Sequence, residues 1–135
     1  MRDRPTHKGI RHLALHVQSL EQMKHFYTEV LGYAVEWEPD SDNIYLTSGT
    51  DNVALHRSVP GTTNEVSSST ALDHFGLVVS SPADVDSWAD YLHAKNVVLD
   101  KAPKTHRDGA RSCYFRDPDG NQIQIIYNPP ISDRS

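Results

Sequence analysis

The 135-residue sequence contains one cysteine, no long hydrophobic run and no excess of positive charge. With only Cys113, an intrachain disulfide and a cysteine-based zinc cluster are excluded, so any bound metal must be held by nitrogen and oxygen. No apolar stretch approaches the roughly 18 residues that cross a bilayer. The formal net charge of -5 gives no general attraction to nucleic acid or anionic lipid. We therefore expect neither a nucleic-acid partner nor a membrane partner.

The first residues also lack the apolar stretch of a signal peptide, which predicts a cytoplasmic protein. Hydrophobic residues make up 37% of the sequence, enough for one core, and we expect a single domain over residues 1–135. Histidine, by contrast, is abundant, with eight residues. These imidazoles are the first candidates for metal binding and acid/base chemistry.

The chain repeats itself with an offset of 62 residues. Alternating side chains predict strands at 12–17 and 74–79, and each is followed by a helix pattern that begins at a serine, Ser19 or Ser81. Gly32 and Asn96 are suited to end these helices. Three further strands are predicted after each helix, at 33–38, 43–47 and 52–57, then at 97–100, 110–115 and 122–127.

This order predicts an α+β fold made of two βαβββ modules. We expect the modules to form a curved mixed sheet around an open cup, with the helices on the outer face. The first module spans about 9–57 and the second about 71–128, and a polar linker at 58–70 joins them. The tail from Asn128 onward is expected to fray.

The alternation also predicts which side chains face away from the helices. In the first strand, Leu13 and Leu15 point to the helix, so His12 and His16 point to the opposite face. The same parity places further polar side chains on that face: His56, His74, Tyr114 and Gln124.

Three motifs resemble the vicinal oxygen chelate superfamily, which includes glyoxalase I, fosfomycin-resistance transferases, extradiol dioxygenases and metal-free bleomycin-resistance proteins. The motifs lie at 9–15, 26–32 and 117–121, so the resemblance covers nearly the whole chain. It implies the cup-shaped fold but does not select a member, since one fold hosts several chemistries.

The resemblance also implies a metal site. Metal-using members of this superfamily hold the ion with a histidine on the first strand, a histidine on the fifth and a glutamate on the last. The matching positions here are His12, His74 and Gln124. We therefore expect a divalent ion, Fe, Mn, Ni or Zn, at this site. Because glutamine supplies a dipole where glutamate supplies a charge, the metal affinity should fall and the site should favour an anionic substrate.

The segment 106–118 resembles the signature of extradiol dioxygenases, which implies catalytic roles for His106 and Tyr114. A solvated loop is the alternative for His106. Basic residues around Arg111 are suited to attract an anion. The predicted substrate-pocket residues are His16, His56, Tyr45 and Arg111.

Two functions remain open at this point. The first is a metal-dependent enzyme, glyoxalase-like or dioxygenase-like, that chelates neighbouring oxygens of a small substrate. The second is a metal-free protein that binds a small molecule, as bleomycin-resistance proteins do; here Tyr45, Trp37 and Tyr114 would stack on the ligand. The sequence favours the enzyme. The resemblance also implies a homodimer.

Overall fold

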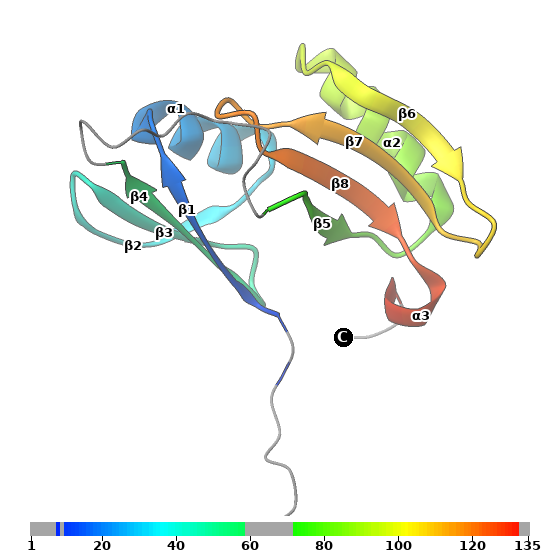
Figure 1. Ribbon diagram of the computed structural model, residues 1–135, viewed down its shortest axis with the longest axis horizontal. Helices are drawn as coiled ribbons and strands as arrows, with labels where there is room; N and C mark the ends of the chain where they lie inside the picture. Colours follow the sequence, from blue (N-terminus) through cyan, green and yellow to red (C-terminus); the bar gives the residue numbers. More distant parts are fainter. Residues whose placement is uncertain (1–7, 9, 59–71, 133–135) are drawn as a thin grey trace, which may run out of the picture. The chain divides into compact units, whose positions relative to one another are not determined.

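The computed structural model describes residues 8, 10–58 and 72–132, and its ribbon is shown in Figure 1. The chain divides into two compact units, residues 1–62 (unit 1) and 63–135 (unit 2). Nearly all of the predicted linker, 59–70, lies outside the described residues. Whether the two units act as a single domain with a cup between them stays a prediction.

Unit 1 contains a four-stranded mixed sheet in the order β1-β4-β3-β2. Strand β1 runs parallel to β4, whereas β3 is antiparallel to both of its neighbours. The parallel pair arises because the chain crosses over through a helix before it returns to the sheet. The strands are β1 (His12–Val17), β2 (Ala34–Asp40), β3 (Asn43–Thr47) and β4 (Asn52–Arg57).

The first helical segment differs from the single α-helix that the sequence predicts. The N-cap is confirmed, since the Ser19 hydroxyl accepts a hydrogen bond from the Gln22 amide at 3.3 Å. The α-helix α1 (Leu20–His25) then continues as a π-helix, η1 (Phe26–Val30). In this wider turn the Thr28 hydroxyl donates to the Lys24 carbonyl at 2.7 Å, which provides a partner for a carbonyl at the transition.

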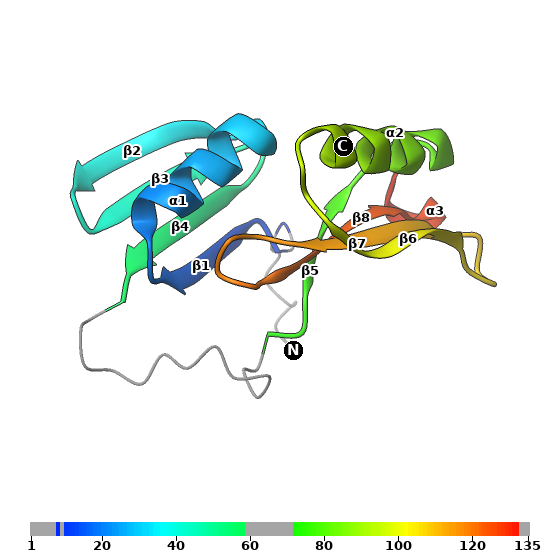
Figure 2. The ribbon, with the colours of Figure 1, turned by 90° about the horizontal axis from the view of Figure 1, so that it is seen from above.

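Unit 2 repeats the topology with the strand order β5-β8-β7-β6, and β5 is parallel to β8. Figure 2 shows helix α2 on one side of this sheet. Helix α2 begins with a capping box in which Ser81 and Asp84 bond each other's backbone amides. The elements are β5 (Phe75–Val78), α2 (Pro82–Ala94), β6 (Leu99–Thr105), β7 (Arg111–Arg116), β8 (Gln122–Tyr127) and α3 (Pro129–Ser132).

Two local predictions for unit 2 were wrong. Strand β6 extends to Thr105 because it pairs with β7 as far as Arg111, and Pro103 is tolerated because β6 is an edge strand. The tail does not fray at Asn128 but forms the short helix α3. There the Asn128 carbonyl accepts from the Ser132 amide at 2.8 Å, and the Ser132 hydroxyl accepts from the Asn128 amide at 2.8 Å.

The predicted α+β class with two βαβββ modules is confirmed. Gly32 (φ 82°) and Asn96 (φ 63°) follow the two main helical segments in the left-handed conformation, as predicted. One face of each sheet packs against its helix, and residues on that face such as Leu55 and Ile125 are fully buried. The opposite face of each sheet carries the polar side chains, as the alternation predicts.

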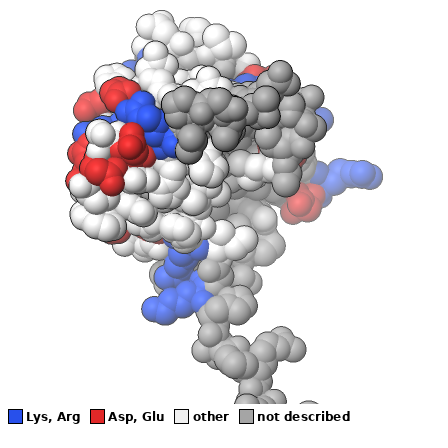
Figure 3. Space-filling view, turned by 60° about the vertical axis from the view of Figure 1, so that its left-hand side comes forward, with Lys and Arg blue, Asp and Glu red and all other residues white. Residues whose placement is uncertain are grey.

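Acidic and basic side chains lie next to one another at the left edge of the surface seen in Figure 3. Lys24 pairs with Glu38 at 3.1 Å, and Arg57 pairs with Glu21 at 2.8 Å and with Asp42 at 3.1 Å. Among the described residues, no helix is both long and apolar enough to span a membrane.

Candidate functional site

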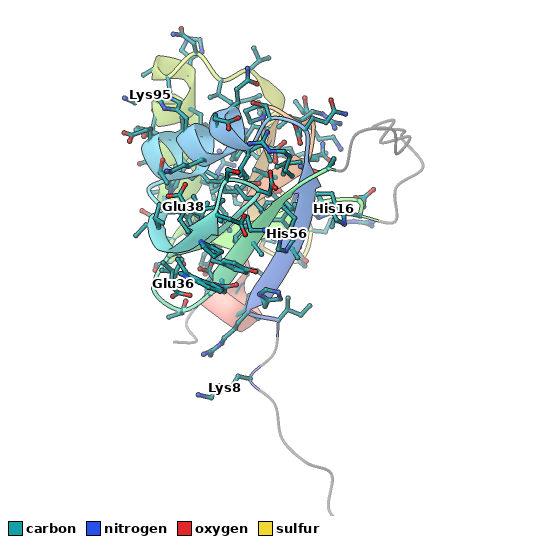
Figure 4. The ribbon with its side chains drawn as sticks, turned by 90° about the vertical axis from the view of Figure 1, so that its left-hand side faces the viewer. Lys8, His16, Glu36, Glu38, His56 and Lys95 are labelled. Atoms are coloured by element: carbon teal, nitrogen blue, oxygen red, sulfur yellow. The ribbon has the colours of Figure 1, made fainter. Side chains whose placement is uncertain are left out.

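The open face of the unit 1 sheet carries three rows of side chains that run across the strands. We name each row after its residue on β1. The His12 row is His12 and Asn52. The Ala14 row is Ala14, Ala54, Tyr45 and Trp37. The His16 row is His16, His56, Asn43 and Asp40. Figure 4 labels His16 and His56 on the adjacent strands β1 and β4.

In the His12 row, hydrogen bonds determine which imidazole nitrogen carries the proton. His12 Nδ1 lies 2.8 Å from Asn52 Oδ1, and Asn52 Nδ2 donates to Glu36 Oε1 at 2.9 Å. Because the asparagine amide already donates to the carboxylate, its oxygen must accept, so His12 Nδ1 is the protonated nitrogen. Nε2 of the neutral imidazole is therefore left with a lone pair. His12 itself is exposed.

The His16 row contains a second chain of the same kind. His56 Nδ1 lies 2.6 Å from Asn43 Oδ1, and Asn43 Nδ2 donates to Asp40 Oδ1 at 2.9 Å. By the same reasoning, the proton is on His56 Nδ1 and the lone pair on Nε2. The His16 and His56 ring centroids are 6.2 Å apart. Hydrogen bonds from the Asp42 backbone amide and from the Asn43 side-chain amide lower the pKa of Asp40. Asp40 is therefore an ionised carboxylate at neutral pH.

The Ala14 row ends in an aromatic pair. Trp37 stacks on Tyr45 with ring centroids 5.1 Å apart and an interplanar angle of 20°, and Trp37 remains 59% exposed. The Tyr45 ring also meets His56 edge-on at 5.9 Å. The two alanines of the row lie beyond Tyr45, away from Trp37, and Ala54 is fully buried.

The matching row of unit 2 is Gly76, Gln124, Tyr114 and Lys101, which we name the Gly76 row. Gln124 is only 9% exposed, and its Nε2 donates to the Tyr114 hydroxyl at 2.9 Å. Oε1 of Gln124 therefore points elsewhere. A Cβ at position 76 would be in ordinary van der Waals contact with it at 3.5 Å, whereas its approach to Ile126 Cγ2, at 3.3 Å, would be tight.

His74 lies beside the Gly76 row, just before β5. Its ring meets the Tyr114 ring edge-on at 5.5 Å. Its Nδ1 is 2.6 Å from Asp73 Oδ2, and since a carboxylate only accepts, Nδ1 carries the proton. Nε2 of the neutral ring is again the nitrogen with the lone pair. The structure thus brings His74, Tyr114 and Gln124 together.

Two basic residues of unit 2 have different surroundings. Lys101 Nζ lies 5.1 Å from the centre of the Tyr114 ring, so it places a positive charge at the Gly76 row. Arg111 lies on the helix side of the sheet instead, where it pairs with Asp86 of α2 at 2.7 Å. This hydrogen bond lowers the pKa of Asp86. Arg111 is therefore on the opposite face of the unit 2 sheet from Tyr114 and Gln124, and its predicted place in the substrate pocket stays a prediction.

His106 follows β6, and its Nε2 lies 3.0 Å from the hydroxyl of the buried Ser112. Ser112 precedes Tyr114 by two residues on β7, so the two share a face of the sheet. Cys113 points to the other face and is fully buried. Burial raises the pKa of its thiol to about 11, which is unfavourable for a nucleophile.

The predicted ligand set combines residues of both units, His12 from unit 1 with His74 and Gln124 from unit 2, and stays a prediction. Within the described part of the chain, no three or more His, Cys, Asp or Glu side chains form a group able to hold a metal ion. The predicted set contains only two side chains of these types, because Gln124 is the third member.

Sequence reasoning missed the partners that orient the histidines: Asn52, Asn43, Glu36 and Asp73. Strand alternation was a usable signal for Asn52, which shares its parity with His56 on β4. No comparable signal existed for Glu36, because the alternation of side chains on β2 is interrupted by a register irregularity between Val35 and Trp37.

Comparison with known proteins gave consistent results. The family model described as "Glyoxalase/Bleomycin resistance protein/Dioxygenase superfamily" matches residues 9–125. Metallothiol transferase FosB of Staphylococcus epidermidis is 27% identical over 127 residues, which is 93% of this chain and 85% of the relative. An uncharacterized protein of Pseudomonas aeruginosa is 27% identical over 130 residues, 93% of each chain. The crystal structure of lactoylglutathione lyase from Agrobacterium tumefaciens has a similar fold, with a TM-score of 0.77, 20% identity and coverage of 94% of this chain and 98% of that one.

Proposed function

Because the chain belongs to the Glyoxalase/Bleomycin resistance protein/Dioxygenase superfamily, we propose that it is an enzyme that uses a divalent metal ion to bind neighbouring oxygens of a small substrate. The ligands in this proposal are His12, His74 and Gln124. One observation carries it: each of these side chains has one polar atom held by a partner, which leaves the other with a lone pair for a metal.

This arrangement fits the usual surroundings of a metal ligand. Metal-binding histidines commonly donate their second N–H to a carboxylate or a carbonyl oxygen, which fixes the tautomer. His12 donates to Asn52 and His74 to Asp73. The ion, Fe, Mn, Ni or Zn, would supply Lewis acidity.

Residues of the Gly76 row support an anionic substrate. The Tyr114 hydroxyl accepts from Gln124, so its own proton is available for a substrate oxygen. Lys101, which lies over the Tyr114 ring, contributes positive charge. His106 can assist proton transfer near the Ser112 end of the same face. Group transfer or a lyase reaction fits the names of the similar proteins, a metallothiol transferase and a lactoylglutathione lyase.

A second function, metal-free binding of a small molecule, is favoured by one specific observation. The exposed Trp37, stacked on Tyr45, offers a flat aromatic surface in the Ala14 row. Beside it, the two rings of the His16 row would line the ligand without a metal. In this alternative Gln124 serves as a hydrogen-bonding group, which needs no carboxylate.

Metal titration of the untagged protein separates these functions. Calorimetry with Fe(II), Mn(II), Ni(II) and Zn(II) is expected to show an equivalent of metal that is lost in His74→Ala and bound more tightly in Gln124→Glu, because a carboxylate adds the missing charge. Metal that stays bound in His74→Ala occupies another site and is counted separately. His93→Ala, which removes an exposed histidine of α2, is the matched control and should bind as wild type. If this equivalent appears only in Gln124→Glu, the protein does not use this metal site and the binding function is correct.

We also propose that the protein is cytoplasmic and forms a homodimer. Sedimentation equilibrium at micromolar concentration is expected to give about twice the chain mass of 15.2 kDa. A mass of one chain under these conditions would contradict the dimer.

A further inference from the structure

The His16 row forms a straight line of polar side chains across all four strands of unit 1. Asp40 on β2 pairs in register with Asn43 on β3, Asn43 with His56 on β4, and His56 with His16 on β1. Register neighbours on adjacent strands lie about 4.8 Å apart and project to the same face. The two imidazoles are therefore neighbours because the backbone places them so, and their ring centroids are 6.2 Å apart.

The hydrogen bonds of this row prepare one imidazole to bind a cation. His56 holds its proton on Nδ1, facing Asn43, so its Nε2 has the lone pair. Behind Asn43 lies the ionised carboxylate of Asp40, which adds negative charge to the row. His16 is exposed, so its ring can reorient toward a shared ion. A hydrogen-bond acceptor behind a histidine is the usual outer shell of a metal ligand. Here that acceptor, Asn43, is half-buried, and Asp40 behind it is exposed.

This pair cannot belong to the same coordination sphere as His12. His16 follows His12 by four residues on β1, which is about 13 Å along a strand. Zinc–nitrogen bonds are only about 2.0 to 2.1 Å long, so one ion cannot bridge that distance. The Ala14 row lies between the two histidine rows.

We propose that His16 and His56 form a separate binding site for a divalent transition metal on unit 1. Imidazole pairs suit zinc, nickel and copper, and two protein ligands leave the remaining positions to water or to an oxygen of a bound molecule. Asn43 is a positioning residue that fixes the His56 tautomer. The site needs no residue of unit 2, so its test does not depend on whether the proposed function is correct.

The test uses the full-length untagged protein carrying His12→Ala and His74→Ala, which removes the other proposed imidazole ligands. Titration with Ni(II) or Zn(II) by calorimetry is expected to show one remaining equivalent. Adding His16→Ala should weaken its affinity by at least about tenfold, and adding Asn43→Ala by about 10- to 100-fold, the usual effect of an outer-shell change. His25→Ala, an exposed histidine on α1, is the matched control and should leave the affinity unchanged.

Nitrogen-15 spectra of the histidine side chains provide the second measurement. On metal addition, Nε2 of His16 and His56 should shift together and saturate at one equivalent. Loss of all binding in the His12→Ala, His74→Ala background, or an affinity that His16→Ala leaves unchanged, would overturn the proposal. Because His16 lies at the surface, its removal should not unfold the protein, and circular dichroism of each variant checks this.

Discussion

The middle rows of the two units occupy equivalent positions but contain different chemistry. Tyr45 pairs with Ala54 in unit 1, and Tyr114 pairs with Gln124 in unit 2. With alanine opposite, Tyr45 stacks on Trp37; with glutamine opposite, Tyr114 accepts a hydrogen bond. The same tyrosine position therefore becomes part of an aromatic surface in one unit and of a polar cluster in the other.

The neighbouring rows reverse this difference. The register pair His16 and His56 of unit 1 corresponds to Val78 and Ile126 of unit 2. Unit 1 thus has imidazoles where β1 ends and alanines in its middle row. Unit 2 has the polar Gln124 and Tyr114 in its middle row and apolar side chains where β5 ends. Two sheets with the same strand pairing can therefore carry their polar side chains in different rows, because each register pair can be substituted separately.

The largest expected effect is a pH-dependent loss of stability that arises at Cys113. This residue lies on the helix side of the unit 2 sheet, at the position that Ile44 occupies in unit 1. Burial raises the pKa of Cys113 from its ordinary 9.0 to about 11, so the folded state holds the thiol proton more tightly than the unfolded state. The resulting stability is fully present below pH 9.0 and is lost as the pH rises toward 11, a change of about 2 to 3 kcal/mol.

Urea unfolding of the wild type and of Cys113→Ala at both ends of that pH range measures this effect. The variant should be less stable at the lower pH because of the cavity, and the difference should shrink as the thiol ionises in the unfolded wild type. Parallel pH profiles of the two proteins would contradict the prediction.

The next effect concerns how each unit orients its first histidine. In unit 1, Asn52→Leu removes the acceptor opposite His12 Nδ1, and the metal affinity that depends on His12 should fall by about 10- to 100-fold. In Asn52→Leu, the imidazole nitrogen-15 shifts should show that His12 no longer carries its proton on Nδ1 alone but exists as a mixture of the two tautomers. Asn52→Asp, which keeps an acceptor oxygen, should retain the Nδ1 proton.

His74 of unit 2 serves as the internal reference, since Asp73 and not Asn52 orients it. Its tautomer should be unchanged in Asn52→Leu. A change at both histidines, or at neither, would show that these hydrogen bonds do not control the tautomers.

The smallest effect tests the middle rows directly. Gly76→Ala should be destabilising, because the new Cβ would lie 3.3 Å from Ile126 Cγ2 and 3.5 Å from Gln124 Oε1. Unit 1 already accommodates alanine at both equivalent positions, Ala14 and Ala54. The tight approach is the one to Ile126, whereas 3.5 Å is ordinary van der Waals contact. In an Ile126→Ala background the cost of Gly76→Ala should therefore decrease, with a coupling energy of about 1 kcal/mol by thermal or urea unfolding. Additive effects would mean that the Ile126 side chain does not oppose a Cβ at position 76.

Much of the fold could be predicted because it rests on local patterns. Alternation gave the strand faces, and the serine caps gave the starts of both main helices. The π-helical continuation at Phe26 and the extension of β6 to Thr105 could not be predicted, because they depend on hydrogen bonds to partners that the sequence pattern does not name. The charge of Arg111 favoured the pocket, whereas in the structure Arg111 pairs with Asp86 on the face that it shares with Cys113, which could not be read from charge; its pocket role stays a prediction.

The sequence by itself determined the two βαβββ modules and the face of each sheet that carries histidines, because side-chain parity and helix capping act between residues close in the chain. Only the tertiary structure decided which nitrogen of each of these histidines carries the proton and which has the lone pair. Asn43 and Asn52 act on imidazoles that are 13 and 40 residues away, respectively, through hydrogen bonds that exist only after the strands pair in one register. Register is a property of the assembled sheet, since a shift of one residue would turn each side chain to the opposite face.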